Sequence, residues 1–319
     1  MRTFVDVTST NGMWRCQSPA MRPALRAPRP SRRAVSAATV ALFATVAVGC
    51  APQPEEDTSG KASASATGAA CAKGELRTEA SGKLTVATDS PAYEPWFKDD
   101  DPKNGEGFES AVAYAVAKQL GYDKADVVWQ SVPFNKAFAP GEKTFDFDIN
   151  QVSVSDERKK AVDFSSGYYD VRQAVIALKG SKAAKAKSIA DLKGLHLGAQ
   201  VGTTSLDYID DVVKPGQDPA AYAKNDQAKS ALKNGQIDAI VVDLPTAFYI
   251  TAAEVTDATI VGQFENKGGT PEQFGLVLDK GSALTPCVTA AVDALREDGT
   301  LAGIEQKWLS DAVDAPVLK

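Results

Sequence analysis

Short apolar runs recur along the chain at lengths typical of buried strands. They lie at Leu84–Thr88, Val127–Gln130, Phe145–Ile149, Ala174–Leu178, Leu195–Ala199, Ala239–Val242, Thr259–Val261 and Gly275–Leu278. Between several of them, apolar residues return at helical spacing. This spacing predicts helices over Glu109–Leu120, Ala228–Lys233 (ending at a C-cap signal, Asn234-Gly235), Leu284–Arg296 and Leu301–Ala312. Alternating strands and helices predict an α/β architecture with mostly parallel sheets.

Two of these runs, Ala174–Leu178 and Gly275–Leu278, flank a complete set of strands and helices. This arrangement is typical of one lobe inserted into another. It predicts a first lobe over 71–173 plus 275–319 and a second lobe over 174–274. A single large doubly wound sheet fits the same pattern. Both alternatives place ligand chemistry in the loops at the carboxyl ends of strands.

The N-terminal segment has the pattern of a secretory signal. Arginines between Arg22 and Arg33 precede an uncharged run, Ala34–Val48, that ends at Gly49–Cys50. This run is shorter than the roughly 20 residues of a membrane-spanning helix. A buried core helix does not fit its arginine-rich and low-complexity flanks. We therefore interpret residues 1–49 as a signal peptide, with Met21 as an alternative start.

Charge and composition restrict the classes of function. The chain has 35 basic and 41 acidic residues, a net charge of −6, but residues 1–49 carry +6 and the remainder −12. Such acidity argues against nucleic-acid binding. One histidine, His196, argues against a multi-histidine metal site and a Ser-His-Asp hydrolase. No phosphate-binding glycine loop, CxxC pair or HExxH motif occurs, so we expect no cofactor and no metal.

The residues Ala47-Val48-Gly49-Cys50 resemble the lipobox of bacterial lipoproteins, in which the cysteine is acylated. Acyl chains on Cys50 would hold the protein at the outer face of the cytoplasmic membrane. Residues 51–70, rich in Ser, Ala, Gly, Thr and Pro, are expected to form a flexible tether. The alternative is an ordinary cleaved signal in which Cys50 has no role.

The segment Ser153–Ser165 resembles the signature region of family 3 of the bacterial extracellular solute-binding proteins. Further similar segments follow the family's order along residues 82–312: Val86–Asp89, Gly107–Glu109, Asp163–Tyr169, Val201–Thr204, Asp238–Asp243, Asp298–Leu301 and Lys307-Trp308. The resemblance implies a type II periplasmic-binding-protein-like fold, with two α/β lobes joined by two crossover segments. It also implies a monomer that binds a polar amino acid and delivers it to the permease of an ABC importer.

The resemblance assigns capture of the ligand's carboxylate to Arg158, whose guanidinium binds a carboxylate bidentately. Arg158 lies in a predicted helix start, where backbone N–H groups also favour an anion, although a merely solvated arginine is the alternative. Thr203 and Thr204 are assigned to the same carboxylate, and Asp243 to the ammonium. A helix N-cap is the alternative for all three. Asp89 is placed near the ammonium or the side chain.

The remaining expected cleft residues come from the same resemblance. Asn150, Gln151 and Ser153 align with small hydroxyl-bearing residues that line the family's cleft, where Asn and Gln depart from the commoner serines. Phe134, Tyr93 and Trp96 fit aromatic lids around a ligand's aliphatic part, with a core role as the alternative. Asp89 and Glu94 favour cationic or neutral polar ligands, whereas Asn150 and Gln151 suit an amide or a carboxylate equally. The amino acid bound is not determined.

Two cysteines, Cys71 and Cys287, remain once Cys16 and Cys50 are assigned to the targeting region. In an exported protein such a pair predicts a disulfide, with two buried free thiols as the alternative. We expect the chain not to be an enzyme. The rival hypotheses are an exported cyclohexadienyl dehydratase, acting on prephenate or arogenate, and a nutrient-sensing lipoprotein on the same scaffold.

Overall fold

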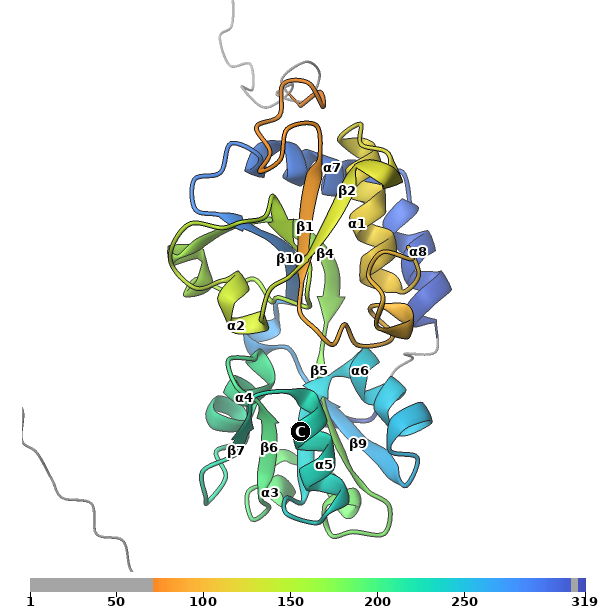
Figure 1. Cartoon of the computed structure of the whole chain (residues 1–319). Coiled ribbons are helices and arrows are strands. Elements are labelled where there is room, and N and C mark those ends of the chain that lie inside the picture. The colour runs from red at the N-terminus through yellow and green to blue at the C-terminus, as the bar shows by residue number, and fades with distance from the viewer. Residues whose placement is uncertain (1–70, 311–314) are drawn as a thin grey trace, which may run out of the picture. The chain divides into compact units, whose positions relative to one another are not determined.

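The computed structural model describes residues 71–310 and 315–319, which form two β-sheets with helices packed on them (Figure 1). The predictions for the signal peptide, Cys50 and the tether lie outside the described residues. Because the strands divide between two sheets, the alternative of one large doubly wound sheet is wrong. Each sheet with its helices forms one α/β lobe.

The first lobe contains the sheet β2-β1-β3-β10-β4. Its strands are β1 (Leu84–Thr88), β2 (Val127–Ser131), β3 (Phe147–Asp148), β4 (Val162–Val171) and β10 (Glu272–Asp279). β1 pairs in parallel with β2 and β3, whereas β10 pairs antiparallel with β3 and β4. The residues of β1, LTVAT, are all buried, as expected of a strand with neighbours on both sides.

Helices α1 (Phe108–Gln119), α7 (Thr285–Glu297) and α8 (Thr300–Leu309) pack together on the first sheet, and the short α2 (Phe134–Ala137) follows β2 (Figure 1). Val112 and Val116, one helical turn apart on α1, meet Val288 and Val292 of α7 in a single core. Both α1 valines lie within the helix that the apolar spacing over residues 109–120 predicted. The core also includes Phe274 of β10.

The second lobe contains the sheet β11-β9-β5-β8-β6-β7. Its strands are β5 (Gln173–Leu178), β6 (Leu197–Gln200), β7 (Ala220–Tyr222), β8 (Ala239–Asp243), β9 (Ala258–Phe264) and β11 (Val317–Leu318). β6 pairs in parallel with β7 and β8, and β5 pairs antiparallel with β8 and β9.

Both faces of the second sheet are buried, which explains its uninterrupted apolar strands. Alternate residues of β5 contribute to opposite cores: Val175 and Ala177 to one, Ala174 and Ile176 to the other. The helices of this lobe are α3 (Ile189–Leu192), α4 (Thr204–Tyr208), α5 (Asn225–Lys233) and α6 (Leu244–Tyr249). The predicted C-cap of α5 is present, because Gly235 has φ +66°.

The prediction of mostly parallel sheets is wrong, since both sheets are mixed. Antiparallel pairs occur at β5 and β10. These are the first strands that the chain forms after each passage from one lobe to the other. Parallel neighbours within a lobe are joined by helical crossovers, whereas a strand that arrives from the other lobe enters the sheet from the opposite end.

The chain passes between the lobes at Arg172, between β4 and β5, and returns between β9 and β10. The sequence predicted boundaries close to both points. One part of the prediction needs correction, because 275–319 was expected wholly in the first lobe. Val317 and Leu318 instead form β11 and pair in parallel with β9 of the second sheet. A two-residue strand has too little periodicity to be predicted.

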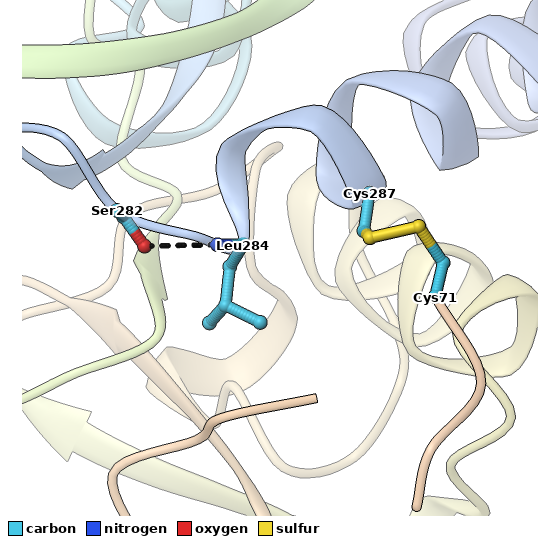
Figure 2. The surroundings of a disulfide bond; sticks show 4 residues. All are labelled: Cys71, Ser282, Leu284 and Cys287. Atoms are coloured by element: carbon cyan, nitrogen blue, oxygen red, sulfur yellow. Dashed lines mark hydrogen bonds between the residues drawn. A yellow bond between two sulfur atoms is a disulfide. The ribbon is translucent and has the colours of Figure 1, made fainter. Parts of the chain in front are cut away.

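The predicted disulfide between Cys71 and Cys287 is present (Figure 2). It joins the beginning of the described chain to the first turn of α7, and its Cα atoms are 5.4 Å apart. Just before α7, the Leu284 N–H donates to Ser282 Oγ at 3.2 Å. Both cysteines pack on the core of the first lobe, so the bond ties the start of this lobe to its C-terminal helices.

Among the described residues, none of the helices combines the length and the apolar character needed to span a bilayer.

We expect replacement of both cysteines (C71S/C287S) to lower the free energy of unfolding by about 2–4 kcal/mol, because the bond closes a long loop in the unfolded chain. Urea denaturation followed by circular dichroism measures this difference. Wild-type protein treated with reductant is the matched control and should unfold like the variant. A variant as stable as oxidised wild type would contradict the structural role of the bond.

Candidate functional site

A cleft between the two lobes brings together the side chains that the sequence predicted as a site. Its cavity volume is about 40 Å³. All ten predicted binding residues line it: Asp89, Tyr93, Phe134, Asn150, Gln151, Ser153 and Arg158 from the first lobe, and Thr203, Thr204 and Asp243 from the second. Gln200 and Asn225 also line the cleft, and sequence reasoning missed both.

Arg158 reaches from the first lobe to the second. One guanidinium nitrogen, Nη1, donates to the Ser153 carbonyl at 2.7 Å, and Nη2 donates to the Gly202 carbonyl at 2.8 Å. The guanidinium carbon lies 4.3 Å from the ring centroid of Phe138 and 5.8 Å from that of Phe134. Burial lowers the pKa of Arg158 from its usual value, yet a guanidinium keeps its charge in proteins. A fixed, partly dehydrated cation therefore faces the cleft.

The helix predicted to begin near Arg158 is wrong, because Arg158–Lys160 forms a single 3₁₀ turn. The Arg158 N–H already donates to Ser155 Oγ at 3.2 Å. Such a turn lacks the aligned peptide dipoles of an α-helix. The positive charge at this point of the cleft is therefore that of the side chain.

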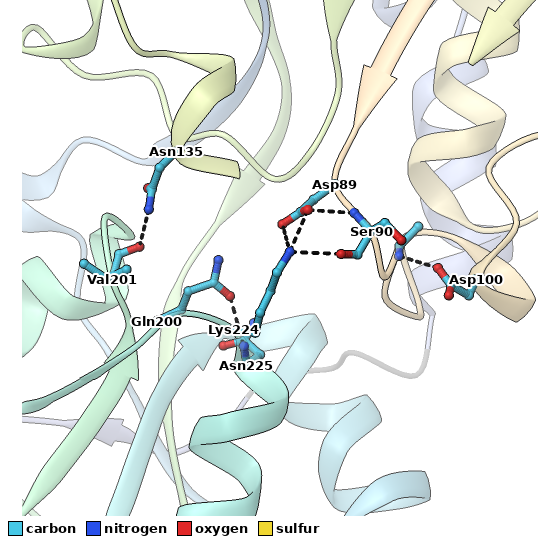
Figure 3. A network of polar contacts seen from close by, with 9 residues as sticks. Asp89, Ser90, Asp100, Asn135, Gln200, Val201, Lys224 and Asn225 are labelled. Carbon is cyan, nitrogen blue, oxygen red and sulfur yellow. Dashed lines mark hydrogen bonds and ion pairs between the residues drawn. The ribbon is translucent and has the colours of Figure 1, made fainter. Parts of the chain in front are cut away.

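Gly202 makes the approach of the second lobe sterically feasible. Its φ is +77°, and a Cβ at this position would lie 2.1 Å from Asn135 Oδ1 of the first lobe. Asn135 also donates from Nδ2 to the Val201 carbonyl at 3.4 Å (Figure 3). A side chain at position 202 would push these two loops apart, and with them Arg158 and its carbonyl acceptor.

Thr203 and Thr204 have different roles at the start of α4. Thr203 is the N-cap, as the alternative reading proposed, because its Oγ1 accepts from the Leu206 N–H at 3.3 Å. Thr204 Oγ1 instead donates to Glu272 Oε1 at 2.5 Å, and Ser153 Oγ donates to the same oxygen at 2.5 Å. Glu272, the first residue of β10, thus joins hydroxyls from both lobes.

Asp243 ends β8 and occupies the N-cap position of α6, but its side chain makes no capping hydrogen bond. Its Oδ1 accepts from Gln173 Nε2 at 2.7 Å. Gln173 is fully buried, and its Oε1 accepts from Ser205 Oγ at 2.6 Å, which fixes the orientation of the amide. Burial and then the charge of Glu272 raise the pKa of Asp243 to about 8.

Asp89 follows β1 and is bound by a lysine from the opposite lobe (Figure 3). Lys224 Nζ lies 2.6 Å from both Asp89 carboxylate oxygens and 2.9 Å from the Ser90 carbonyl. Lys224 immediately precedes α5. Sequence reasoning missed this residue, because nothing local distinguishes it from other surface lysines.

The two amide residues of the first lobe differ in their hydrogen bonding. Gln151, with φ +49°, donates from its backbone N–H to Glu109 Oε1 at 2.7 Å and from Nε2 to the other Glu109 oxygen. Its amide nitrogen is therefore held by the first lobe. Asn150 is 7% exposed, and its Nδ2 has no hydrogen-bond partner among the described residues.

The three aromatic residues expected as lids separate into two groups. Phe134 and Tyr93 line the cleft. Trp96 is fully buried in the first lobe's core, with edge-to-face contacts to Phe108, Tyr169 and Phe274. The interpretation of Trp96 as a lid is therefore wrong, and its core alternative is confirmed.

Two buried carboxyl groups lie behind the cleft in the first lobe. Glu109 accepts from Tyr168 Oη as well as from Gln151, and burial raises its pKa to about 7. Asp148 is fully buried without a hydrogen-bond partner among the described residues, and burial raises its pKa well above the usual range. The described residues contain no cluster of histidine, cysteine and acidic side chains suited to a metal ion.

Residues 84–311 match the model of the bacterial extracellular solute-binding proteins, family 3. The chain belongs to this family. The sequence is 31% identical over 231 residues to the L-cystine-binding protein TcyJ of Escherichia coli K12, covering 71% of this chain and 82% of TcyJ. It is also 31% identical to the glutamine-binding protein GlnH of Bacillus subtilis, covering 66% and 76%.

Solved structures of similar proteins share the fold described above. An ancestral arginine-binding protein bound to arginine is 32% identical, with a TM-score of 0.60, over 71% of this chain and 97% of that one. An ancestral amino-acid-binding protein described as a precursor of cyclohexadienyl dehydratase is 30% identical, with a TM-score of 0.60, over 71% and 95%. The fold is thus that of the bilobal periplasmic amino-acid-binding proteins.

Proposed function

We propose that the protein binds a polar amino acid in the cleft and delivers it to the permease of an ABC importer. The observation that carries this proposal is the charge arrangement of the cleft. Arg158 of the first lobe supplies a fixed cation, while Asp243 of the second lobe supplies an acid beside Glu272. A free amino acid is a small ligand that carries a planar carboxylate and a compact ammonium. Its carboxylate suits the guanidinium of Arg158, and its ammonium suits the acid of Asp243.

In this proposal the guanidinium of Arg158 binds the ligand's carboxylate. The hydroxyls of Ser153 and Thr204, which donate to Glu272 Oε1 without ligand, assist only by turning from Glu272 to the ligand. Asp243 receives the ammonium. Because these groups come from different lobes, a ligand is held at both ends only when the lobes close on it, and binding stabilises the closed state. An affinity near micromolar, about −8 kcal/mol, is appropriate for such a receptor.

The proposed role needs no covalent step. Glutamine-, cystine- and arginine-binding relatives support transport, and the cleft acids Asp89 and Asp243 are each bound by a side chain of the protein. Turnover of prephenate or arogenate by the purified protein would instead establish the dehydratase hypothesis. Under the nutrient-sensing hypothesis, the protein would bind the same ligand but pass the signal to a sensor kinase, and it would not support uptake of the ligand.

A thermal-shift screen of the twenty amino acids and cystine tests ligand binding directly. We expect at least one polar amino acid to raise the melting temperature, and we expect Arg158→Ala to weaken its binding by about 2–5 kcal/mol, the usual effect of truncating one partner of a buried charge pair. Arg158→Lys should restore only part of the loss, because an ammonium lacks the planar fork.

The neighbouring, exposed Lys159 provides the matched control, and Lys159→Ala should bind like wild type. Calorimetric titration gives the affinities, and circular dichroism verifies that each variant is folded. If no amino acid stabilises the protein, the proposed function is wrong. If Arg158→Ala retains full affinity, only the role of Arg158 is wrong.

Affinity should increase as the pH rises from 6 to 8. The pKa of Asp243 is about 8 without ligand, so this side chain is largely protonated below pH 8. An ammonium pairs with the ionised form, so binding releases a proton, and the affinity gains up to about tenfold per pH unit in this range.

Titration calorimetry in two buffers of different ionisation enthalpy measures the proton release. Asp243→Asn should remove both the pH dependence and most of the affinity. Glu109→Gln is the control for a second buried acid of raised pKa, since Glu109 lies behind Gln151, and this variant should retain the pH dependence. If the affinity does not change between pH 6 and pH 8, the assignment of the ammonium to Asp243 is wrong.

We further propose that the mature chain is anchored through acylated Cys50, on the basis of the lipobox-like residues 47–50 and the family's extracellular location. Expressed in a bacterial host, wild type should fractionate with membranes, and Cys50→Ala should be lost from the membrane fraction as the acyl chains are removed. Cys16→Ala is the matched cysteine control. Recovery of wild type in the soluble fraction would contradict the anchor.

A further inference from the structure

The ion pair between Asp89 and Lys224 uses the full donor capacity of the lysine. An ammonium has three N–H donors, and Lys224 has three acceptors within 2.9 Å: both oxygens of Asp89 and the carbonyl of Ser90. The Asp89 side chain is 10% exposed and that of Lys224 31%. One Asp89 oxygen also accepts from the Ser90 N–H at 2.7 Å. The carboxylate is therefore shielded from water, the lysine is partly exposed, and the pair is internally satisfied.

This pair changes the ligand preference that Asp89 would confer alone. A free carboxylate in the cleft would bind the guanidinium of arginine or the ammonium of lysine. With Lys224 in place, a cationic ligand side chain meets a neutralised carboxylate and a second cation. Displacing Lys224 would leave its ammonium partly buried without a partner, which is costly. A close like charge thus disfavours cationic ligands.

Neither Asp243, the other acid that lines the cleft, nor Glu272 beside it provides a substitute for Asp89. Asp243 is bound by Gln173, and Glu272 by Ser153 and Thr204, at the end of the cleft assigned to the amino-acid head group. Asn150, Gln200 and Asn225 add uncharged amides to the lining. Gln200 Oε1 accepts from the Asn225 N–H at 3.1 Å (Figure 3). The unpartnered Nδ2 of Asn150 requires an acceptor oxygen.

We propose that Lys224 is a specificity-determining residue that restricts the cleft to amino acids with neutral, hydrogen-bonding side chains, such as glutamine, and excludes arginine and lysine. This inference rests on the proposed function. Lys224 acts through Asp89: it occupies the carboxylate that a cationic side chain would need, and it does so from the opposite lobe, so that the selection operates when the lobes are closed.

Calorimetric titration of glutamine and arginine into the purified full-length protein tests the inference. Wild type should bind glutamine at least tenfold more tightly than arginine. Lys224→Gln, which frees Asp89, should raise the affinity for arginine relative to glutamine at least tenfold. Adding Asp89→Asn to this variant should abolish the gain, because the freed carboxylate is then removed. Lys233→Gln, at the end of the same helix α5, should behave like wild type.

The ratio of the two affinities separates selectivity from any general weakening of closure by the substitution. The inference is overturned if wild type binds arginine as tightly as glutamine, or if Lys224→Gln leaves the ratio unchanged while amino acids still bind. Failure of every amino acid to bind wild type and variants alike would instead overturn the proposed function. A gain for arginine that persists in the double variant would show that Asp89 is not the group involved.

Discussion

The guanidinium of Arg158 is the contact on which the geometry of the cleft depends. It binds a carbonyl of its own lobe at Ser153 and a carbonyl of the other lobe at Gly202. The second bond requires that position 202 has no side chain, since a Cβ there would collide with Asn135. One cation therefore joins the loop after β3 to the loop after β6 and also lines the cleft.

Charge compensation is the second constraint, because ionised groups shielded from water need partners. Asp89 has Lys224, Asp243 has the oriented amide of Gln173, and Glu272 has two hydroxyls. Asp243 is the least compensated of these, since it accepts one hydrogen bond from a neutral amide and lies beside the charge of Glu272, and burial together with that charge raises its pKa. A ligand ammonium would supply the missing charge. The cleft thus contains one acid without a cationic partner, Asp243, and one that already has a cationic partner, Asp89.

The cleft was more predictable from the sequence than the fold around it. All ten predicted binding residues, which the family resemblance implied, line the cleft. For strand–loop positions such as Asp89 and Asp243 the physical reason is that they converge at the carboxyl ends of their strands. The local hydrophobic pattern did not reveal β4, because polar residues such as Ser165 and Ser166 interrupt its apolar ones. It did not reveal the mixed sheets either, because these follow from the passages of the chain between the lobes. Gln173, Lys224 and Glu272 were also missed. Their importance comes from contacts with residues far away in the chain, and each has an unremarkable sequence neighbourhood.

Family membership alone does not determine the ligand, since relatives of similar identity bind cystine, glutamine or arginine. In the proposed function, Arg158 and Asp243 bind the part common to all amino acids, so selectivity has to come from other groups. Asp89 by itself would attract arginine to the first lobe. Lys224 belongs to the second lobe, so its ammonium reaches Asp89 only as the cleft closes. An arginine bound to the first lobe would therefore oppose closure, whereas a neutral side chain would leave the ion pair free to form. On this proposal, discrimination between ligands would take place in the closing step, the same step that would complete the head-group site.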